Sequence, residues 1–292
     1  MHFVLFRSRG ETVGTVGVLD GRGSVTSLDC SLPELLAREV AEIREAALAP
    51  PGARRSLEEV ELLPPIDGRM ELWAAGVTYQ RSRDERMAES TGAAALYDAV
   101  YDAPRPELFL KATAWRAVGD GDAIGVRGDS AINVPEPELA LLVRGDGAIV
   151  GYGVCDDVSS RTIEGENPLY LPQAKIYTAS CALGHRVRPA WEIEDPYALT
   201  MRIAIERNGV AVYAAEASTG QLKRRFDELV GYLLAELEFP EGAWLSTGTS
   251  LVPELPFSLQ PGDRVRITID EVGTLVNEVA LASTLRTAPA LR

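Results

Sequence analysis

Hydrophobic and polar residues alternate along much of the chain, and this period of two predicts a protein built mainly from short strands. The alternation is clear in residues 3–18 and 24–28, and it returns in residues 107–190 and 198–216 between turns that contain glycine or proline. Helical spacing is confined to a few segments that do not alternate regularly with the strands. The pattern therefore predicts an α+β, β-rich fold rather than a βαβ arrangement.

Two segments have the apolar spacing of a helix that packs against a core. The first begins at Ser31 with Pro33 in its first turn, and its apolar face comprises Leu36, Val40, Ile43 and Ala47. The second stops at Pro240, and its apolar residues are Leu222, Phe226, Leu229, Leu233 and Leu237. A further helix is expected in the charged stretch that runs to Tyr101.

The segment APPGARRS, at residues 49–56, is the clearest linker in the chain. We expect residues 1–65 to form a small N-terminal α+β domain that ends in the strand-like LEEVELLPP, and residues 66–292 to form a larger domain. A chain of 292 residues can bury a substantial core as one large domain or as a large domain and a small one.

The charge balance excludes several classes of partner. With 43 acidic and 29 basic residues the net charge is -14, which argues against nucleic acid or an anionic membrane. The first apolar stretch is too short and too soon interrupted by charge for a signal peptide, and no later segment is apolar enough to span a bilayer. We therefore expect a cytoplasmic protein that acts on no membrane.

Cysteine and histidine are scarce, which limits the available chemistry. The three cysteines have no C-x-x-C spacing, so neither a disulfide framework nor a thiolate zinc site is indicated. The two histidines, His2 and His185, are too few for an H-E-x-x-H zinc protease, a three-histidine site or most Ser-His-Asp triads. Catalysis would depend on carboxylates, lysine, arginine and a hard metal ion.

The stretch VPEPELALLV places two glutamates at the start of an apolar strand. Glu136 and Glu138 lie two residues apart and so point to the same face, and both faces of the strand become apolar beyond them. Two explanations are open. Either the start of the strand protrudes into water and the pair is solvated, or the two carboxylates hold a cation.

A hairpin through RGDG, residues 144–147, brings a third carboxylate to these two. A two-residue or four-residue loop pairs Glu138 with Gly153 and places Asp157 on the same face, whereas a three-residue loop favours Asp156. In the first register, the small residues of the second strand leave an open space beside the carboxylates. Three carboxylates around a cavity predict a site for Mg²⁺ or Mn²⁺.

Two basic residues follow in the same part of the chain. Arg161 and Lys175 can balance the charge of such a site or bind an anionic substrate. For each residue taken alone, a surface ion pair is the simpler explanation.

Seven motifs follow one another along the chain, namely GVTY, ELFLK, PEPELALLV, GYGVCDDVSSR, QAK, TGT and PGD followed by GTLVNEV. In this order they resemble the fumarylacetoacetate hydrolase superfamily, from about residue 70 to residue 280. PEPELAL and SSR-x-IEGENPLYLPQAK look most like its 2-dehydro-3-deoxy-D-arabinonate (sugar acid) dehydratase-like branch. The resemblance implies that the larger domain is a catalytic, mixed β-sandwich roll of the C-terminal domain type, and that the protein is a homodimer.

The resemblance also implies the roles of individual residues. Mg²⁺ would be held by Glu136, Glu138 and Asp157, the same trio that the hairpin brings together. Lys175 would stand beside the metal, and Thr249 of TGT would help to hold the substrate carboxylate. Further candidates for substrate binding are Arg161, Lys111 and Tyr170.

Several positions depart from the superfamily pattern. C–C bond hydrolases carry a histidine and a glutamate after the GVTY-like motif to activate water, and Ser82 and Glu85 stand at these positions here. The missing histidine argues against hydrolysis, and the dehydratase-like branch tends to have serine there. Thr162, Asp156 and His185 differ from that branch too, which leaves the substrate open.

These features together predict a Mg²⁺-dependent lyase that dehydrates a 2-keto-3-deoxy sugar acid, a small anionic 2-keto acid, through a metal-stabilised enolate. The candidate catalytic residues are Lys175, Glu85 and Ser82, with Glu89 as the alternative glutamate on the same helix. Related enolate chemistry would serve a hydrolase, a decarboxylase or an isomerase. A catalytically idle homologue that binds a keto acid is the alternative from a different class.

Overall fold

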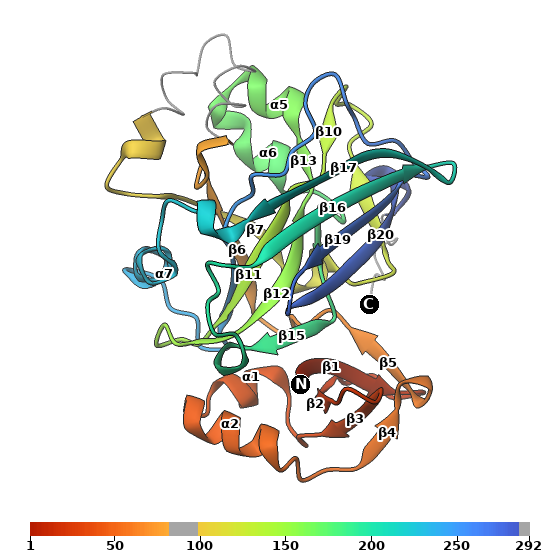
Figure 1. The fold of residues 1–292 in the computed structure, drawn as a ribbon, viewed down its shortest axis with the longest axis vertical. Helices are drawn as coiled ribbons and strands as arrows, with labels where there is room; N and C mark the ends of the chain where they lie inside the picture. Colours follow the sequence, from red (N-terminus) through yellow and green to blue (C-terminus); the bar gives the residue numbers. More distant parts are fainter. Residues whose placement is uncertain (82–98, 286–292) are drawn as a thin grey trace, which may run out of the picture.

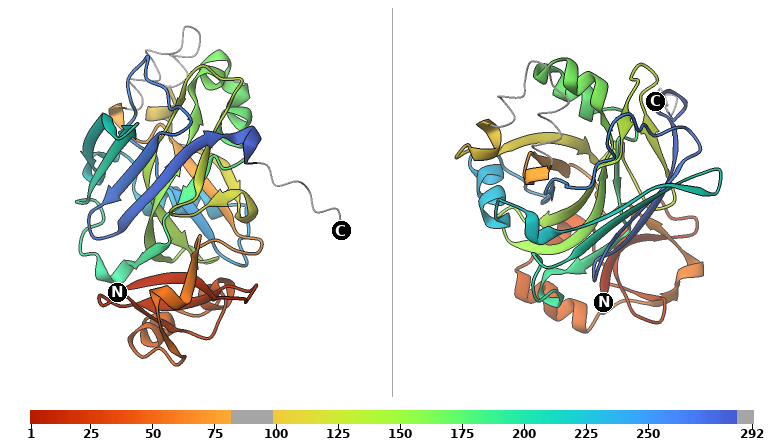
Figure 2. Two further views of the ribbon diagram at one scale, coloured as in Figure 1. Left: turned by 90° about the vertical axis from the view of Figure 1, so that its right-hand side faces the viewer. Right: turned by 45° about the horizontal axis from the view of Figure 1, so that its top comes forward.

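The structure, a computed structural model, describes residues 1–81 and 99–285. Within these ranges the chain forms a 13-stranded sheet, a five-stranded sheet and a two-stranded ladder, with short helices at their edges (Figure 1). A small unit built from the N-terminal residues lies at one end of the molecule (Figure 2). The predicted β-rich α+β class is confirmed.

The N-terminal unit combines five strands with two helices. Its strands are β1 (His2–Ser8), β2 (Thr15–Leu19), β3 (Ser24–Ser27), β4 (Arg54–Ser56) and β5 (Val60–Leu63). The single helix predicted after Ser31 is wrong, because α1 (Leu32–Leu36) and α2 (Val40–Leu48) are separate. The break occurs at Glu39, which has an extended backbone and donates its N–H to the Glu42 side chain at 3.0 Å, so that a second helix starts there.

The 13-stranded sheet continues from this unit into the rest of the molecule along the path β4-β3-β2-β1-β15-β12-β11-β18-β6-β7. The later strands of this path are β6 (Glu71–Gly76), β7 (Glu107–Thr113), β11 (Pro137–Val143), β12 (Ile149–Asp157), β15 (Arg186–Pro189) and β18 (Ala243–Ser246). Strand β14 (Cys181–Leu183) pairs with β12 and with β8 (Ala117–Val118). Because β1 pairs with β15, hydrogen bonding crosses the expected boundary at residue 65. The division into two domains stays a prediction.

The five-stranded sheet packs against one face of the larger sheet. In the order β17-β16-β19-β20-β9, its strands are β17 (Val210–Ser218), β16 (Thr200–Arg207), β19 (Arg264–Ile269), β20 (Gly273–Leu281) and β9 (Ala123–Val126). A hydrophobic core fills the space between the sheets and includes α7 (Phe226–Leu234). Helix α7 is shorter than predicted, so Leu222 precedes it and Leu237 is 44% exposed. The predicted sandwich is confirmed.

One face of β11 points into the core between the two sheets, and the candidate functional residues lie on the other face. Leu139 and Leu141 point into the core between the sheets, whereas Ala140 and Leu142 pack with Trp244 and apolar residues of α1. Glu136 and Glu138 share the face of Ala140 and Leu142, because side chains alternate along a strand. The N-terminal unit thus covers one end of this face, and the two glutamates occupy the other end.

Short elements surround that second end. β13 (Ser159–Ser160) pairs with β10 (Asn133–Val134) and leads into α5 (Arg161–Glu166), whose first turn is capped by Ser160. A 3-10 turn, η3 (Pro168–Tyr170), then joins α5 to α6 (Leu171–Lys175). None of the described helices has the length and apolarity to cross a bilayer.

Candidate metal centre

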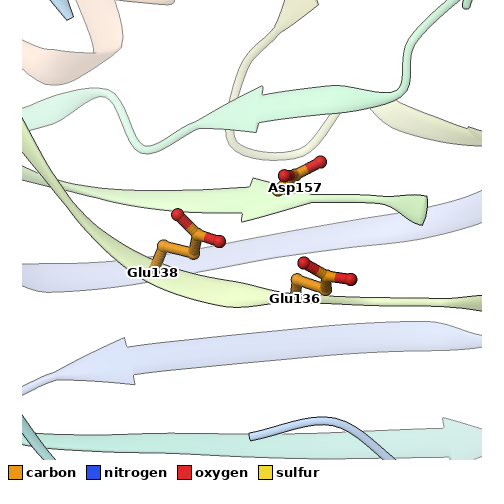
Figure 3. Close-up of side chains that lie close together, drawn as sticks. All are labelled: Glu136, Glu138 and Asp157. Carbon is orange, nitrogen blue, oxygen red and sulfur yellow. The ribbon is translucent and has the colours of Figure 1, made fainter. Parts of the chain in front are cut away.

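Three buried carboxylates lie together where β11 begins and β12 ends. Glu136 immediately precedes β11, Glu138 is its second residue, and Asp157 is the last residue of β12 (Figure 3). Each offers an oxygen within 4.8 Å of the oxygens of the other two. Their exposed fractions are only 4%, 2% and 1%, so the explanation of a solvated pair of glutamates does not hold.

The hairpin that aligns these residues has a different register from the predicted one. Glu138 lies opposite Cys155 rather than Gly153. One residue of this shift comes from a three-residue loop at 145–147, and the other comes from a bulge near the end of β11. Because the two shifts together preserve the alternation of faces, Asp157 faces the glutamates as predicted.

The open space expected beside the small residues of β12 is filled by other parts of the protein. A Cβ atom on Gly153 would lie 2.9 Å from the Trp244 ring, and one on Gly151 would lie 2.7 Å from the Arg188 carbonyl oxygen. These glycines therefore admit an indole ring and a neighbouring strand, and that part of the prediction is wrong.

Lys175 joins two of the three carboxylates. Its Nζ donates to Glu136 Oε2 at 2.8 Å, to Asp157 Oδ2 at 3.0 Å and to Ser159 Oγ at 2.6 Å. The lysine is 2% exposed and is the last residue of α6. An ammonium group can be buried in this way because carboxylates on both sides compensate its charge.

A second lysine, Lys111 on β7, is fully buried behind Asp157. Its Nζ lies 2.5 Å from Asp157 Oδ1 and donates to Val158 O at 2.9 Å and to Lys175 O at 2.6 Å. The two carbonyl contacts are hydrogen bonds, and the contact with Asp157 is an ion pair. Lys111 therefore holds Asp157 and the end of α6 in place, and the structure does not bring it to the wall of the pocket.

Glu138 is held from the opposite side by the TGT region. Its Oε2 accepts hydrogen bonds from Ser246 Oγ and from Gly248 N, the latter at 2.8 Å. Gly248 has a φ of +89°, and a Cβ atom there would lie 2.0 Å from Thr78 Oγ1, so only glycine fits. Burial raises the pKa of Glu138 to about 8, and repulsion from Asp157 and Glu136 adds to the effect.

Carboxylates dominate the described lining of the pocket. Five carboxylates line it together with two cationic side chains, and Lys111 adds one more positive charge behind the wall. The oxygen donors of the three clustered carboxylates fit a hard divalent cation, which would also relieve the repulsion that raises the pKa of Glu138.

A family model described as the fumarylacetoacetate (FAA) hydrolase C-terminal domain matches residues 72–280. The chain belongs to the fumarylacetoacetate hydrolase family. The matched segment contains all three carboxylates and both lysines, whereas most of the N-terminal unit precedes it.

Other members of the fumarylacetoacetate hydrolase family are similar over most of the chain. A "Probable 2-keto-3-deoxyxylonate dehydratase" of Haloferax volcanii is 54% identical over 215 residues, which cover 74% of this chain and 73% of that protein. A 2-dehydro-3-deoxy-D-arabinonate dehydratase of Saccharolobus solfataricus is 42% identical over 227 residues, 76% of each chain. A solved 2-keto-3-deoxy-D-arabinonate dehydratase, complexed with magnesium and 2,5-dioxopentanoate, matches with a TM-score of 0.83 at 34% identity and covers 96% of this chain and 99% of its own. The structural likeness therefore includes the N-terminal unit.

The rest of the pocket wall in this fumarylacetoacetate hydrolase family member was only partly predicted. Arg161 and Thr249, which were predicted to bind substrate, line the pocket, and Arg161 Nη2 lies 3.6 Å from Glu136 Oε1. Glu107 and Glu164 also line it and were missed.

The two missed glutamates lie within motifs that had been noticed for other reasons. Glu107 begins ELFLK and lies over Gly76 of GVTY, where a Cβ atom would come within 2.0 Å of Glu107 Oε2. Glu164 lies one turn after Arg161 on α5, so both side chains reach the same pocket. The glycine that faces Glu107 across β6 and β7 was a usable signal.

Tyr170, which was predicted to bind substrate, is not part of this wall. It lies on η3 and is 40% exposed. Ser82, Glu85 and the alternative Glu89 lie outside the described residues.

The three departures from the dehydratase-like branch do not alter the described pocket wall. Thr162 Oγ1 accepts a hydrogen bond from Ile132 N at 2.9 Å, and His185 packs beside Gly119. Asp156 lies on the face of β12 opposite to Asp157 and is fully buried, and burial raises its pKa to about 7. None of these three residues lines the described part of the pocket.

Proposed function

We propose that the protein is a Mg²⁺-dependent dehydratase of a 2-keto-3-deoxy sugar acid and that Glu136, Glu138 and Asp157 hold the metal. The observation that carries the proposal is the buried trio of carboxylates, whose oxygens lie within 4.8 Å of one another. A divalent ion bound by these oxygen ligands relieves their mutual repulsion. Relatives that are 54% and 42% identical are named as dehydratases of this substrate class, and a solved relative holds magnesium and 2,5-dioxopentanoate.

Dehydration of such an acid begins with the loss of a proton from C3, next to the keto group. Bound Mg²⁺ supplies a Lewis acid for the negative charge that then develops on the keto oxygen. Arg161 and Thr249 are suited to bind the substrate carboxylate from the same pocket. Thr249 Oγ1 accepts a hydrogen bond from Leu251 N at 3.0 Å, which leaves its hydroxyl hydrogen available to the substrate.

Proton transfer is divided between Lys175 and a carboxylate. Lys175 donates to three acceptors, as an ammonium group does, so it can deliver a proton to the C4 hydroxyl while the C4–O bond breaks and water leaves. Glu85, with Ser82 nearby in the chain, stays our candidate for removing the C3 proton. Glu107 and Glu164 are the alternatives that line the described pocket. Tautomerisation of the unsaturated acid then gives a keto-aldehyde, the class to which 2,5-dioxopentanoate belongs.

A substrate panel tests this function. The protein is incubated with 2-keto-3-deoxy pentonates and hexonates, oxaloacetate and acylpyruvates, each with Mg²⁺ and with EDTA. We expect a keto-aldehyde from a keto-deoxy sugar acid only when Mg²⁺ is present, and a loss of activity in Lys175→Met. Turnover of an acylpyruvate or of oxaloacetate alone would instead assign C–C hydrolysis or decarboxylation. Calorimetric binding of pyruvate with Mg²⁺, but no turnover, would assign an idle keto-acid-binding homologue.

We further propose that the protein is a homodimer in the cytoplasm, as the family resemblance implies. Light scattering coupled to gel filtration is expected to give twice the chain mass of 31.5 kDa. A mass of one chain at micromolar concentration would refute the dimer and leave the chemistry of the pocket unaffected.

A further inference from the structure

The ladder between β11 and β12 is irregular at Glu136. Asp157 N donates to Glu136 O at 2.9 Å, and in a regular antiparallel ladder Glu136 N would return a hydrogen bond to Asp157 O. Glu136 N donates instead to Asp156 Oδ1, at 3.0 Å. The side chain of Asp156 thus takes the place of a main-chain acceptor.

The carbonyl of Asp157 has a different donor as a result. Ser159 Oγ donates to Asp157 O at 3.0 Å and accepts from Lys175 Nζ at 2.6 Å. Because a serine hydroxyl has one hydrogen to donate, its bond to the carbonyl leaves its lone pairs directed to the lysine. Lys175 Nζ completes a closed ring of contacts by donating to Glu136 Oε2 at 2.8 Å.

Within the described residues, the ladders next to Glu136 supply few other main-chain hydrogen bonds. β18 pairs with β11 only from Ala140 to Val143, and Pro137 has no N–H to donate. The position of the Glu136 backbone therefore depends on its contacts with residues 156 and 157 of β12.

We propose that Asp156 is a positioning residue of the metal centre. Its Oδ1 fixes the main chain of Glu136, and by diverting the Glu136 amide it frees the Asp157 carbonyl to hold Ser159 against Lys175. Asp156 is fully buried outside the pocket lining, and its Oδ2 has no hydrogen-bond partner within the described part of the chain. The role needs one acceptor oxygen and no charge, so asparagine would serve equally. This inference rests on the proposed function only in taking Glu136 as a metal ligand.

Two substitutions separate the acceptor from the charge. We expect Asp156→Ala to weaken Mg²⁺ binding, measured by calorimetry without substrate, by about 10- to 100-fold, as loss of a group that orients a ligand does. Hydrogen exchange at the Glu136 amide should become faster in the same variant. Asp156→Asn should keep both properties close to those of the wild-type protein. Wild-type Mg²⁺ affinity and amide protection in Asp156→Ala would overturn the proposal, as would an asparagine variant as weak as the alanine variant.

A further variant controls for a general loss of folding. Asp263 is as fully buried as Asp156, but it pairs with Arg207 at 2.7 Å away from the pocket. Asp263→Ala should lower the melting temperature and leave the Mg²⁺ affinity unchanged.

Ser159→Ala tests the contact between Ser159 and Lys175. It should lower kcat while Mg²⁺ still binds, and an unchanged kcat would refute the part of the proposal that concerns Ser159 and Lys175. If the wild-type protein binds Mg²⁺ but dehydrates nothing on the panel, the proposed function fails while the Asp156 variants still test the positioning role.

Discussion

The two ends of one face of the 13-stranded sheet are covered in different ways. At the Leu142 end, apolar side chains of α1 and Trp244 cover the strands, and the charges of the N-terminal unit stay outside. At the Glu136 end, the covering groups are the carboxylates and lysines of the metal centre. The same sheet thus serves as the base of a hydrophobic core and as the wall of a polar pocket.

The difference shows that burial, rather than distance, decides how strongly the loss of an ion pair affects stability. Arg7 and Glu61 approach to 2.6 Å at the N-terminal unit, with side chains 35% and 55% exposed. Lys175 and Glu136 approach to 2.8 Å, with side chains only 2% and 5% exposed. An exposed pair contributes about 0.2–1 kcal/mol, whereas removing one partner of a buried pair costs about 3–5 kcal/mol.

Glu138→Gln should have the largest effect of the changes that probe this contrast. The amide keeps the shape of the side chain but withdraws a charged ligand, so we expect Mg²⁺ affinity and kcat/KM to fall by at least about 100-fold. Calorimetry with Mg²⁺ and the dehydration assay measure the two quantities. Turnover at the wild-type rate would mean that the polar end of the face is not a metal site.

Two glycines offer a matched test of intermediate size. A Cβ atom would lie 2.9 Å from the Trp244 ring on Gly153, and 2.5 Å from Val25 Cγ1 on Gly17. Either alanine variant should lose about 1–3 kcal/mol of unfolding free energy through overpacking. Only Gly153→Ala should also lower activity per folded molecule, because Trp244 and Ser246 share β18 and Ser246 holds Glu138. Equal activity in the two variants would show that packing at Trp244 does not affect Glu138 through β18.

A smaller effect is expected from pH at the N-terminal unit. Burial, together with Arg188 and other positive charges, lowers the pKa of His2 to about 4, and its Nε2 lies 3.1 Å from the Val272 carbonyl oxygen. As pH falls from 6.5 towards 4, the unfolded chain takes up a proton that the folded protein refuses, so stability decreases over this window. His2→Gln should reduce this loss of unfolding free energy by about 1–2 kcal/mol. This is less than the free energy that corresponds to the full pKa shift, because the ring is only partly buried.

Denaturant unfolding at pH 7 and at pH 5 measures the His2 effect. The difference between wild type and His2→Gln should widen in favour of the variant at the lower pH. An identical pH response of the two proteins would show that this histidine is not coupled to folding.

The smallest effect should come from Arg7→Ala. The pair that it removes is exposed, so we expect a smaller loss of unfolding free energy than in any of the other variants, and a still smaller loss at high salt. Urea unfolding and the dehydration assay provide the measurements, with activity unchanged. A loss as large as that of a buried pair would contradict the contrast between the two ends.

Alternation and helical spacing predicted most of the elements, because each residue's face follows from local geometry. Asp157 was assigned to the correct face although its predicted strand partners were wrong by two residues. The face on which a residue lies depends only on whether the register shift is even or odd. The strand partner of the residue depends on a loop and a bulge that no local pattern reveals.

Features that depend on distant segments were not predictable in the same way. Gly153 indicated an empty space because the sequence does not show that Trp244 fills it. Glu107 and Glu164 were missed because their roles depend on β7 and α5 converging on one pocket. Glu39, which starts a second helix, lies within a run that keeps its apolar spacing, so the break between α1 and α2 was hidden.

The pairing of β1 with β15 has a consequence for how the chain is made. Strand β5 covers β1 from Leu5 to Ser8, but Phe3 and Val4 gain a strand neighbour on that edge only from Arg186 and Val187. At ribosomal rates those partners follow on the order of 10 s or more after β1. Until then a growing chain carries a short, apolar, unpaired strand edge of the kind on which chains aggregate. Chains cut short before β15 should therefore depend on chaperones more than the full-length protein does.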